Sequence, residues 1–388
     1  MKIAIVCSYD FSIAWSLEIF IKKLLKENHI ITVISDVHDG HTENFYLDTI
    51  TKWGVNHEFL KTYRFFSPYE DIKYLYGIYK HLTKNNYDMV INIATKPNIY
   101  GSVAAKLAGI KNIICFAWGL GLTFEKSNSI GRIFLKYALL FLYFIAFKIS
   151  KKIWFTNKND LEYFLRKKIL SEGKSFLSNG FVDTESFSPS IITTKVKDEY
   201  RNKLGFDSKD KVIILVARMS WAKGIKQFCE ASDILRKKNP EAKFLLIGQD
   251  DKGSPDAVPE QYIKKYASHN NFLHLGYRVD IKELYSISYM AVFPSYYREG
   301  GWPRGLTEPM SMGKPVITTD NIHASGAVIH GKNGFIVPMK DSYELANSIK
   351  ILLDDSALAS KFGQESRKLA IKNLDEKKIM SDLIQAII

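Results

Sequence analysis

The sequence predicts an α/β protein built from two doubly wound domains with parallel sheets. The chain has 388 residues, which is more than one ordinary domain contains and is comfortable for two. Short apolar segments alternate with helical periodicities in both halves, and this alternation is typical of βαβ units with parallel strands. With 46% hydrophobic and 24% charged residues, the chain can fill two cores.

In the first half, the helical and extended patterns follow one another in regular order. Ser12 is the expected N-cap of a helix whose apolar residues recur at helical spacing through Leu24. Further helices are expected at 72–82 and at 101–108. Apolar, β-rich segments predict strands at residues 2–6, 30–34, 89–94 and 112–117.

The second half repeats the alternation after a linker rich in Ser and Thr. One helix is expected at 224–238, where Asn239-Pro240 ends it. Strands are predicted at residues 211–216, 243–247, 271–275, 290–293 and 315–319. The linker, residues 178–199 with Pro189, places the boundary near residue 190. In doubly wound sheets, ligands bind beyond the carboxyl ends of the strands, so we expect the two domains to face a cleft.

The composition excludes several classes of function. No GxGxxG fingerprint and no GxxxxGK[ST] loop is present, which argues against NAD or ATP at the first turn. The three cysteines are far apart in apolar segments and are expected to be reduced, buried thiols of a cytosolic protein. A net charge of +13 favours anionic partners. No nucleic-acid motif is found, so a membrane surface and a diphosphate ligand are the favoured partners.

Residues 294–315, PSYYREGGWPRGLTEPMSMGKP, are the most informative segment. A predicted strand runs into a glycine-rich loop and then into a helical pattern. A helix start presents unpaired N–H groups and favours anions such as diphosphate. Gly300, Gly301 and Gly305 would let the backbone approach a ligand, and Glu299 and Glu308 could accept hydrogen bonds from sugar hydroxyls. The alternative is an ordinary β-to-α loop with surface glutamates.

Residues 131–153 form a second unusual segment. Tyr137–Phe147 is a run of eleven apolar residues, and basic residues flank it: Arg132, Lys136, Lys148, Lys151 and Lys152. A bilayer span needs about 20 apolar residues, so a transmembrane helix is the least favoured reading. The segment is typical either of a core helix with charged ends or of an interfacial helix that docks on a membrane.

The loop at 294–315 resembles the donor-site signature of family 4 glycosyltransferases with the GT-B fold. Eight residues separate Glu299 from Glu308, one more than is usual there. Further segments resemble the family in order along nearly the whole chain: Gly119-Leu120-Gly121, 178–183, Ala217-Arg218, Lys223-Gly224, 272–278 and 331–338. Trp118 stands where many relatives carry a His before the GLG-type turn.

The resemblance implies an acceptor-binding domain at 1–190 and a nucleotide-sugar-binding domain at 191–370. A C-terminal helix at 371–388 would pack back on the first domain. Arg218 and Lys223 would stabilise charge on the departing diphosphate, although a basic surface turn is the alternative. The implied catalytic residues are Arg218, Lys223 and Glu299. The implied donor-binding residues are Gly119, Tyr277, Arg278, Gly300, Gly301, Arg304, Leu306, Thr307 and Glu308. The acceptor-side residues are Trp118 and Gly121 together with Lys96, which follows a predicted strand end and could face an acceptor phosphate; a surface lysine is the alternative for Lys96.

These implications lead to one expected activity. The protein would be a retaining hexosyltransferase that uses no cofactor and no metal, and Asp250-Asp251 would be a solvated turn. It would move a hexose or N-acetylhexosamine, with N-acetylgalactosamine favoured, from a UDP-sugar to a polyprenyl-diphosphate-linked saccharide in bacterial surface or glycoprotein glycan assembly. We expect it in the cytoplasm, peripheral on the inner face of the cytoplasmic membrane. The alternatives are a UDP-sugar epimerase of the same fold and a non-catalytic nucleotide-binding subunit that docks on the membrane.

Overall fold

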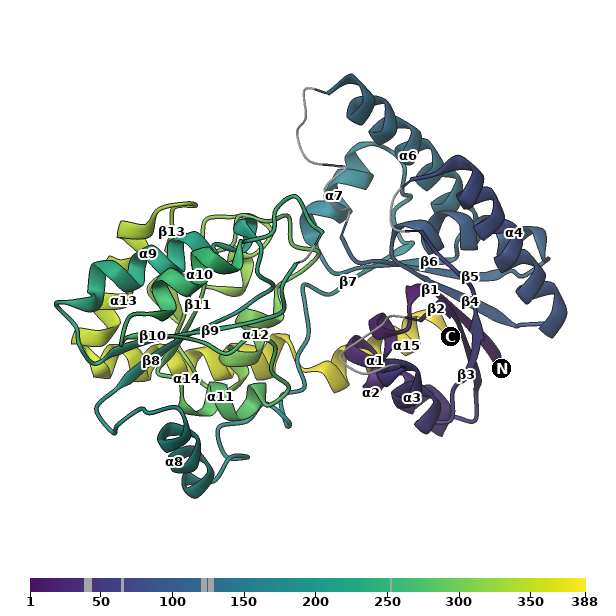
Figure 1. The fold of residues 1–388 in the computed structure, drawn as a ribbon. Coiled ribbons are helices and arrows are strands. Elements are labelled where there is room, and N and C mark those ends of the chain that lie inside the picture. Colours follow the sequence, from purple (N-terminus) through teal and green to yellow (C-terminus); the bar gives the residue numbers. More distant parts are fainter. Residues whose placement is uncertain (38–43, 64–65, 120–123, 125–128, 252) are drawn as a thin grey trace. The chain divides into compact units, whose positions relative to one another are not determined.

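A computed structural model describes residues 1–37, 44–63, 66–119, 124, 129–251 and 253–388 (Figure 1). The chain divides into two compact units: Met1–Asn179 with Lys377–Ile388, and Gly180–Glu376. Each unit contains one parallel sheet with helices in its crossovers. The predicted fold class, two doubly wound α/β domains, is therefore confirmed.

The sheet of the first unit changes direction once. Its strand order is β3-β2-β1-β4-β5-β6-β7, and every pair is parallel. The chain winds outward from β1 to β3, returns, and winds the other way from β4, so the reversal lies between β1 and β4. The strands are β1 (Lys2–Tyr9), β2 (Ile30–Asp36), β3 (Asn56–Phe59), β4 (Met89–Ile93), β5 (Asn112–Ala117), β6 (Lys152–Phe155) and β7 (Ser175–Leu177).

The helices of the first unit lie in two sets. Right-handed crossovers place the helices that follow β3, β4 and β5 on one face of the sheet and those that follow β1 and β2 on the other. The helices are α1 (Phe11–Ser16), α2 (Glu18–Lys26), α3 (Phe45–Lys52), α4 (Pro68–Asn85), the π-helical turn η1 (Pro97–Gly101), α5 (Ser102–Leu107), α6 (Ile130–Ile149), α7 (Lys158–Arg166) and α15 (Glu376–Ile387). The predicted N-cap Ser12 is wrong: Asp10 precedes α1, and its carboxylate accepts the N–H of Phe11.

The sheet of the second unit reverses between β8 and β11. Its order is β10-β9-β8-β11-β12-β13, again with parallel pairs. The strands are β8 (Lys211–Val216), β9 (Ala242–Ile247), β10 (Phe272–His274), β11 (Met290–Phe293), β12 (Val316–Thr319) and β13 (Gly334–Val337). The helices are α8 (Thr194–Lys203), η3 (Trp221–Lys223), α9 (Ile225–Arg236), α10 (Glu260–Ala267), α11 (Ile281–Ile287), α12 (Arg304–Ser311), η4 (Ser325–Ala327), α13 (Ser342–Asp354) and α14 (Ser356–Asn373).

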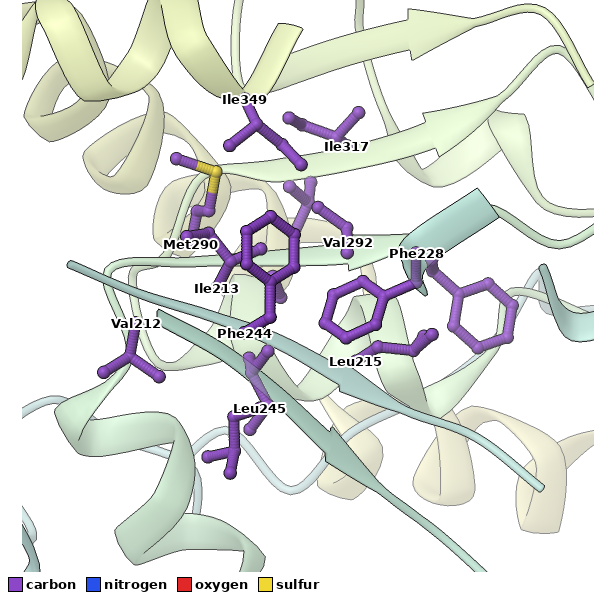
Figure 2. Close-up of a cluster of buried hydrophobic side chains, with 14 of the residues drawn as sticks. Val212, Ile213, Leu215, Phe228, Phe244, Leu245, Met290, Val292, Ile317 and Ile349 are labelled. Carbon is purple, nitrogen blue, oxygen red and sulfur yellow. The ribbon is translucent and has the colours of Figure 1, made fainter. Parts of the chain in front are cut away.

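The core of the second unit packs both faces of this sheet (Figure 2). Because both faces are covered, the strands are continuous apolar runs rather than alternating ones. The residues labelled in the figure are all buried: Val212, Ile213, Leu215, Phe228, Phe244, Leu245, Met290, Val292, Ile317 and Ile349. This packing holds β8 and β11 rigidly beneath the loops that follow them.

The first unit ends at Asn179, earlier than the boundary expected near residue 190. The intervening residues belong to the second unit because they pack there. The N–H of Val182 donates to the carbonyl of Leu374 at 2.8 Å, and Phe187 packs against the second core. The guanidinium of Arg367 donates to the carbonyls of Thr184 and Phe187. The Ser- and Thr-rich composition therefore marks a segment that is bonded in place on the second unit.

Candidate functional site

Two loops meet at the strand reversal of the second unit. β8 leads into residues 217–224, and the neighbouring β11 leads into residues 294–303. At such a reversal the two connections leave in opposite directions, and doubly wound proteins bind ligands there, beyond the carboxyl ends of the two strands. The sheet therefore brings together the two segments in which the sequence predicted donor-binding residues.

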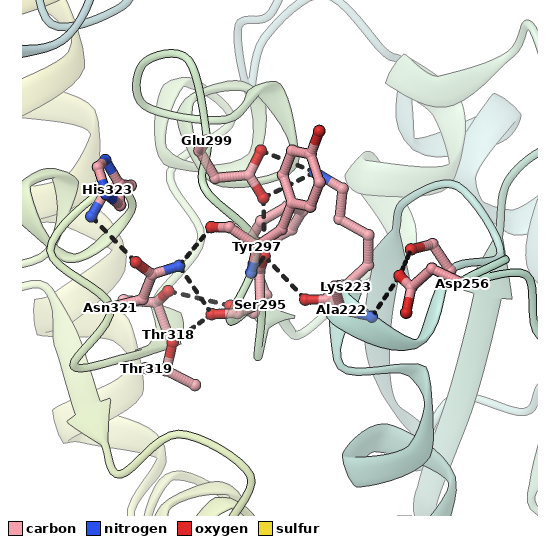
Figure 3. Close-up of polar contacts among 12 residues, drawn as sticks. Ala222, Lys223, Asp256, Ser295, Tyr297, Glu299, Thr318, Thr319, Asn321 and His323 are labelled. Atoms are coloured by element: carbon pink, nitrogen blue, oxygen red, sulfur yellow. Dashed lines mark hydrogen bonds and ion pairs between the residues drawn. The ribbon is translucent and has the colours of Figure 1, made fainter. Parts of the chain in front are cut away.

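Lys223 and Glu299 form a buried ion pair where the two loops meet (Figure 3). The Lys223 Nζ lies 2.7 Å from both carboxylate oxygens of Glu299, and both residues are buried. The ammonium also lies over the rings of Tyr297 and Phe293, 4.5 and 5.6 Å from their centroids. A paired charge among aromatic rings has a fixed position. A charge that acts on a ligand needs such a fixed position.

Gly224 lets the two loops approach each other. Its φ of +78° is a left-handed conformation, and a Cβ at this position would lie 2.2 Å from the carbonyl oxygen of Pro294. A side chain here would push the two loops apart. The position of Lys223 beside Glu299 therefore depends on this glycine.

A polar network fixes the loop that carries Glu299. The hydroxyl of Ser295 lies 2.7 Å from the Glu299 carboxylate and donates to it. The amide of Asn321 donates to the carbonyls of Ser295 and Tyr297 at 3.3 and 2.7 Å (Figure 3). The hydroxyl of Thr319 donates to the same Ser295 carbonyl at 2.5 Å. Ser295, Asn321 and Thr319 are all buried, so these contacts hold the loop firmly.

Asp256 fixes the other loop. Its carboxylate accepts the N–H of Ala222 at 3.0 Å and the hydroxyl of Ser220. Sequence reasoning missed Asp256, Ser295 and Asn321. Asn321 carries a signal that could have been used, since it follows a predicted strand and therefore lies at the ligand-binding edge of the sheet. Asp256 carries none, because its partners are set by folding.

Arg218 begins the same loop and also has an acidic partner. Its guanidinium lies 3.1 Å from the carboxylate of Asp251, and its side chain is 47% exposed. The expectation that Asp250-Asp251 is a solvated turn is wrong for Asp251, whose side chain is only 13% exposed in this pair. In the described part of the chain, no three His, Cys, Asp or Glu side chains gather in the manner of metal ligands.

Glu308 lies in the second turn of α12 and is buried. Burial raises the pKa of its carboxyl to about 7, against the smaller opposing effects of Arg304 and Lys282. The Arg304 guanidinium is 3.7 Å from the carboxylate. Within the described residues, the buried hydroxyls of Thr307 and Tyr285 have no hydrogen-bond partner. Unsatisfied polar groups and a carboxyl whose pKa is raised by burial are features that functional sites often combine.

Gly305 has a packing role that the sequence reasoning did not predict. A Cβ there would meet the Phe293 ring at 2.7 Å and the carbonyl of Val216 at 2.8 Å. The glycine therefore lets the first turn of α12 lie directly on β8 and β11. The side chain of Leu306 is buried in the core, and the N–H groups of Leu306 and Thr307 donate to the carbonyl of Pro303. The N–H groups of Arg304 and Gly305 come before these two and have no acceptor within the helix itself, as at any helix start.

Tyr277 and Arg278 follow β10, as predicted. The guanidinium of Arg278 pairs with the carboxylate of Asp280, which also accepts the hydroxyl of Tyr200 from α8 at 2.9 Å. This hydrogen bonding keeps the pKa of Asp280 below its usual value. Arg278 is thus linked through Asp280 to α8 and α11. Lys223, by contrast, contacts Glu299 directly. Gly300 and Gly301 follow Glu299 in the loop, ahead of α12.

The acceptor-side residues lie in the first unit. Lys96 is not the surface lysine that the sequence left open: its ammonium is 2.5 Å from the buried carboxylate of Asp71, which also accepts the hydroxyl of Tyr100. Ala94, just before it, has a φ of +76°, a strained conformation for a residue with a Cβ. Strain of this kind at a strand end is typical of functional loops.

Trp118 and Gly119 follow β5 at the same edge of that sheet. The indole ring of Trp118 stacks on Phe116 and meets Trp154 edge-on, with centroids 6.0 and 5.7 Å apart. Within the described part of the chain its N–H has no acceptor. Gly119 has a φ of +86°, and Gly121 lies outside the described residues.

Comparison with known proteins places this geometry in a family. Residues 3–157 match the family model "Glycosyl transferase 4-like", and residues 196–369 match "Glycosyl transferases group 1". A Campylobacter jejuni N,N'-diacetylbacillosaminyl-diphospho-undecaprenol α-1,3-N-acetylgalactosaminyltransferase is 27% identical over 79% of this chain and 78% of its own. An Escherichia coli UDP-Gal:α-D-GlcNAc-diphosphoundecaprenol α-1,3-galactosyltransferase is 27% identical over 74% of this chain and 72% of its own.

Solved structures agree on the fold. Anabaena HepE, solved in complex with UDP, matches all of this chain and 99% of its own with a TM-score of 0.79 at 18% identity. A glycosyltransferase from Rickettsia africae matches all of this chain and 97% of its own with a TM-score of 0.79 at 20% identity. The two family models together span most of the sequence: one covers β1–β6 of the first sheet and the other covers all strands of the second. The chain therefore belongs to the glycosyltransferases of the GT-B fold, with a family 4-like first unit and a group 1 second unit.

Proposed function

We propose that the protein is a retaining glycosyltransferase that takes its donor sugar from a UDP-sugar. The acceptor is a polyprenyl-diphosphate-linked saccharide in the assembly of a bacterial surface or glycoprotein glycan. N-acetylgalactosamine is the favoured sugar. The named activities of the Campylobacter and Escherichia relatives support this choice, since both act on undecaprenyl-diphosphate-linked sugars.

The buried Lys223–Glu299 pair is the observation that carries the proposal. An ammonium has three N–H donors, and a carboxylate that takes two leaves one for a diphosphate oxygen. As the glycosidic bond breaks, negative charge grows on the departing diphosphate, and a cation fixed beside it stabilises that charge. Arg218, at the rim of the same loop, adds a second cation for this charge.

The two glutamates have separate roles in this proposal. Glu308, buried in α12, accepts the ribose hydroxyls of UDP. Glu299 holds Lys223 and faces the transferred sugar, for which the loop glycines Gly300 and Gly301 leave room. Tyr277 and Arg278 border the position of the base, and Arg304 at the open start of α12 adds a positive charge near the phosphates.

The acceptor is proposed to bind the first unit. Lys96, with Asp71 as its partner, lies at the carboxyl edge of β4, and Trp118 lies at the carboxyl edge of β5. An aromatic ring suits the apolar face of a saccharide, and an ammonium suits a phosphate. The protein acts in this proposal as a peripheral protein on the inner face of the cytoplasmic membrane, where α6 with its basic flanks contacts the lipid.

A panel of UDP-sugars tested against undecaprenyl-diphosphate-linked saccharides in detergent is the direct test. We expect release of UDP and an extended lipid-linked product with one preferred donor, and the product's anomeric configuration should match that of the donor. Incubation with the UDP-sugar alone is the control. Conversion of the UDP-sugar to its epimer without an acceptor would establish an epimerase instead. Binding of UDP without any transfer across the panel would indicate a non-catalytic subunit.

A further inference from the structure

The helix α6 presents an apolar face to solvent. It is the one helix, among the residues that the structure describes, that is long and apolar enough to cross a membrane, and only 22% of its 18-residue apolar stretch is buried. Leu140, Tyr143, Ala146 and Phe147 pack inward. The opposite face exposes residues at successive helical turns: Ile130, Phe134, Tyr137, Phe141 and Phe144.

A second helix has a similar outer face. Tyr69, Ile72 and Tyr76 of α4 are all exposed and recur at helical spacing, and Ile72 is 69% exposed. Their neighbours on the same side of the helix include Lys73, whose ammonium lies 4.0 Å from the centroid of the Tyr69 ring. Aromatic side chains with lysines between them are typical of surfaces that lie at the level of lipid headgroups.

The two faces belong to one surface. α4, α5 and α6 follow β3, β4 and β5, so right-handed crossovers put them in one layer on the same side of the sheet. α4 contacts α5, α5 contacts α6, and Figure 1 shows α4 and α6 together in the same layer. The solvent-facing sides of helices in one layer point the same way, away from the sheet. Their exposed apolar residues can therefore meet one flat partner together.

The charges of this surface select an anionic partner. α6 carries Arg132, Lys136 and Lys148 and no acidic residue. On α4, Lys73, Lys80 and Lys84 are exposed, while Asp71 is buried against Lys96 and Glu70 lies 3.9 Å from Lys73. A second copy of this chain would be a poor partner, because a two-fold interface would place like-charged α6 helices against each other.

We propose that α4 and α6 together form a two-helix docking face for an anionic lipid surface. This inference rests on the proposed lipid-linked acceptor and deepens it. The exposed apolar residues of α4 lie in its N-terminal half, and those of α6 begin at its first residue. In a βαβ unit the start of a helix lies at the carboxyl edge of the strands. That edge also holds Lys96. Docking by both helices would bring this edge, and the proposed acceptor residues on it, to the level of the headgroups.

Vesicle sedimentation tests the proposal. The full-length protein should bind vesicles of phosphatidylcholine with phosphatidylglycerol, and binding should weaken as salt screens the lysines. Ile72→Ser/Tyr76→Ser in α4 and Phe134→Ser/Phe141→Ser in α6 should each weaken binding by roughly 10- to 100-fold, because each pair withdraws two large side chains from the lipid. Tyr343→Ser/Ile371→Ser, at two exposed positions of the second unit, is the matched control and should bind like the wild type.

Site-specific labelling distinguishes one helix from two. The native thiols Cys7, Cys115 and Cys229 are buried. An environment-sensitive fluorophore on Ile72→Cys and on Phe134→Cys should therefore report lipid contact at both helices, and one on Tyr343→Cys should stay silent. A response at position 134 alone would overturn the two-helix face. Silence at both positions would overturn docking altogether.

Two further measurements separate this proposal from its rivals. Transfer to an acceptor in detergent needs no vesicle. Absence of transfer by the wild-type protein in detergent would therefore refute the proposed activity and would leave the vesicle-binding result unaffected. Both serine variants should keep wild-type transfer in detergent, which also shows that they fold. Sedimentation velocity without lipid tests for a second copy: a concentration-dependent dimer that the serine changes abolish, together with no vesicle binding, would refute the lipid proposal.

Discussion

Lys223 and Arg218 look alike in sequence, yet the structure separates them. Both are basic residues in one loop, but Lys223 is buried against Glu299 and Arg218 is half exposed beside Asp251. Removing either cation should reduce turnover by roughly 10²- to 10³-fold, the scale of losing one group that stabilises transition-state charge. Steady-state kinetics with a UDP-sugar and a lipid-linked acceptor measures this. Wild-type turnover in either variant would remove that residue from the site.

Stability should distinguish the two cations. Lys223→Ala leaves the Glu299 carboxylate buried without its partner, which costs about 3–5 kcal/mol in such pairs. Arg218→Ala should lose at most about 1 kcal/mol, because the Arg218 side chain is half exposed and its charge is screened by solvent. Chemical denaturation checks both values. The double variant Lys223→Met/Glu299→Gln should recover most of the stability while staying inactive, which separates loss of chemistry from loss of fold.

The roles proposed for the two glutamates predict different binding defects. Glu308→Ala should weaken UDP by roughly 10- to 100-fold, since a hydrogen bond to a charged group contributes about 1.5–3 kcal/mol. Glu299→Gln should leave UDP affinity unreduced, because it frees Lys223 for the diphosphate, but it should impair sugar transfer. Calorimetric titration of UDP into each variant decides this. Equal affinity in wild type and Glu308→Ala would mean that the ribose contact lies elsewhere.

Glu308 should also make stability depend on pH. Its pKa of about 7 in the fold lies above the ordinary value of 4.5, so the folded protein binds this proton more tightly than the unfolded chain does. The resulting stabilisation is full below pH 4.5 and is lost as the pH rises through 7. In Glu308→Gln, stability should not fall in this way as the pH rises. Glu199→Gln, at an exposed position, should behave like wild type. Unfolding midpoints between pH 4.5 and 8 measure the difference.

At the scale of elements, the packing of α12 on the sheet depends on Gly305, which has no side chain. A methyl group at residue 305 would meet the Phe293 ring and the Val216 carbonyl below 3.0 Å, so α12 would have to move away from the sheet. Gly305→Ala should therefore cost about 1–3 kcal/mol, typical of overpacking, and weaken UDP binding as Glu308 shifts. Gly131→Ala, at a helical position where a Cβ would meet no atom closer than 4.0 Å, is the control without displacement of a helix. Unchanged UDP affinity in Gly305→Ala would show that α12 does not position the donor.

For the whole molecule, we propose that residues of the chain, and not a metal ion, supply the positive charge that the donor diphosphate needs. Lys223, Arg218 and the start of α12 supply positive charge at one edge of the sheet, so transfer should persist in excess EDTA. The measurement is initial rate with and without the chelator. A complete loss that Mg²⁺ or Mn²⁺ restores would refute metal-independent transfer.

Local sequence patterns predict much of the architecture. The strands at 112–117, 211–216 and 290–293 have the bounds that their apolar runs predict, because a strand covered on both faces must be apolar throughout. β3, β6 and β7 carry a weaker signal. β3 lies at an edge of the sheet and is largely uncovered, β6 follows directly on an apolar helix, and β7 has only three partly buried residues.

The sequence by itself determined the fold class, the order of most strands along the chain and the two loops that carry Lys223 and Glu299. Only the tertiary structure decided what those loops do to each other. Lys223 and Glu299 lie 76 residues apart, and they meet because the sheet reverses between β8 and β11. The exposure of α6 was decided in the same way. Apolar periodicity shows that a helix has two faces, but only the packing of α5, α6 and α7 on the sheet determines which of those faces stays in solvent.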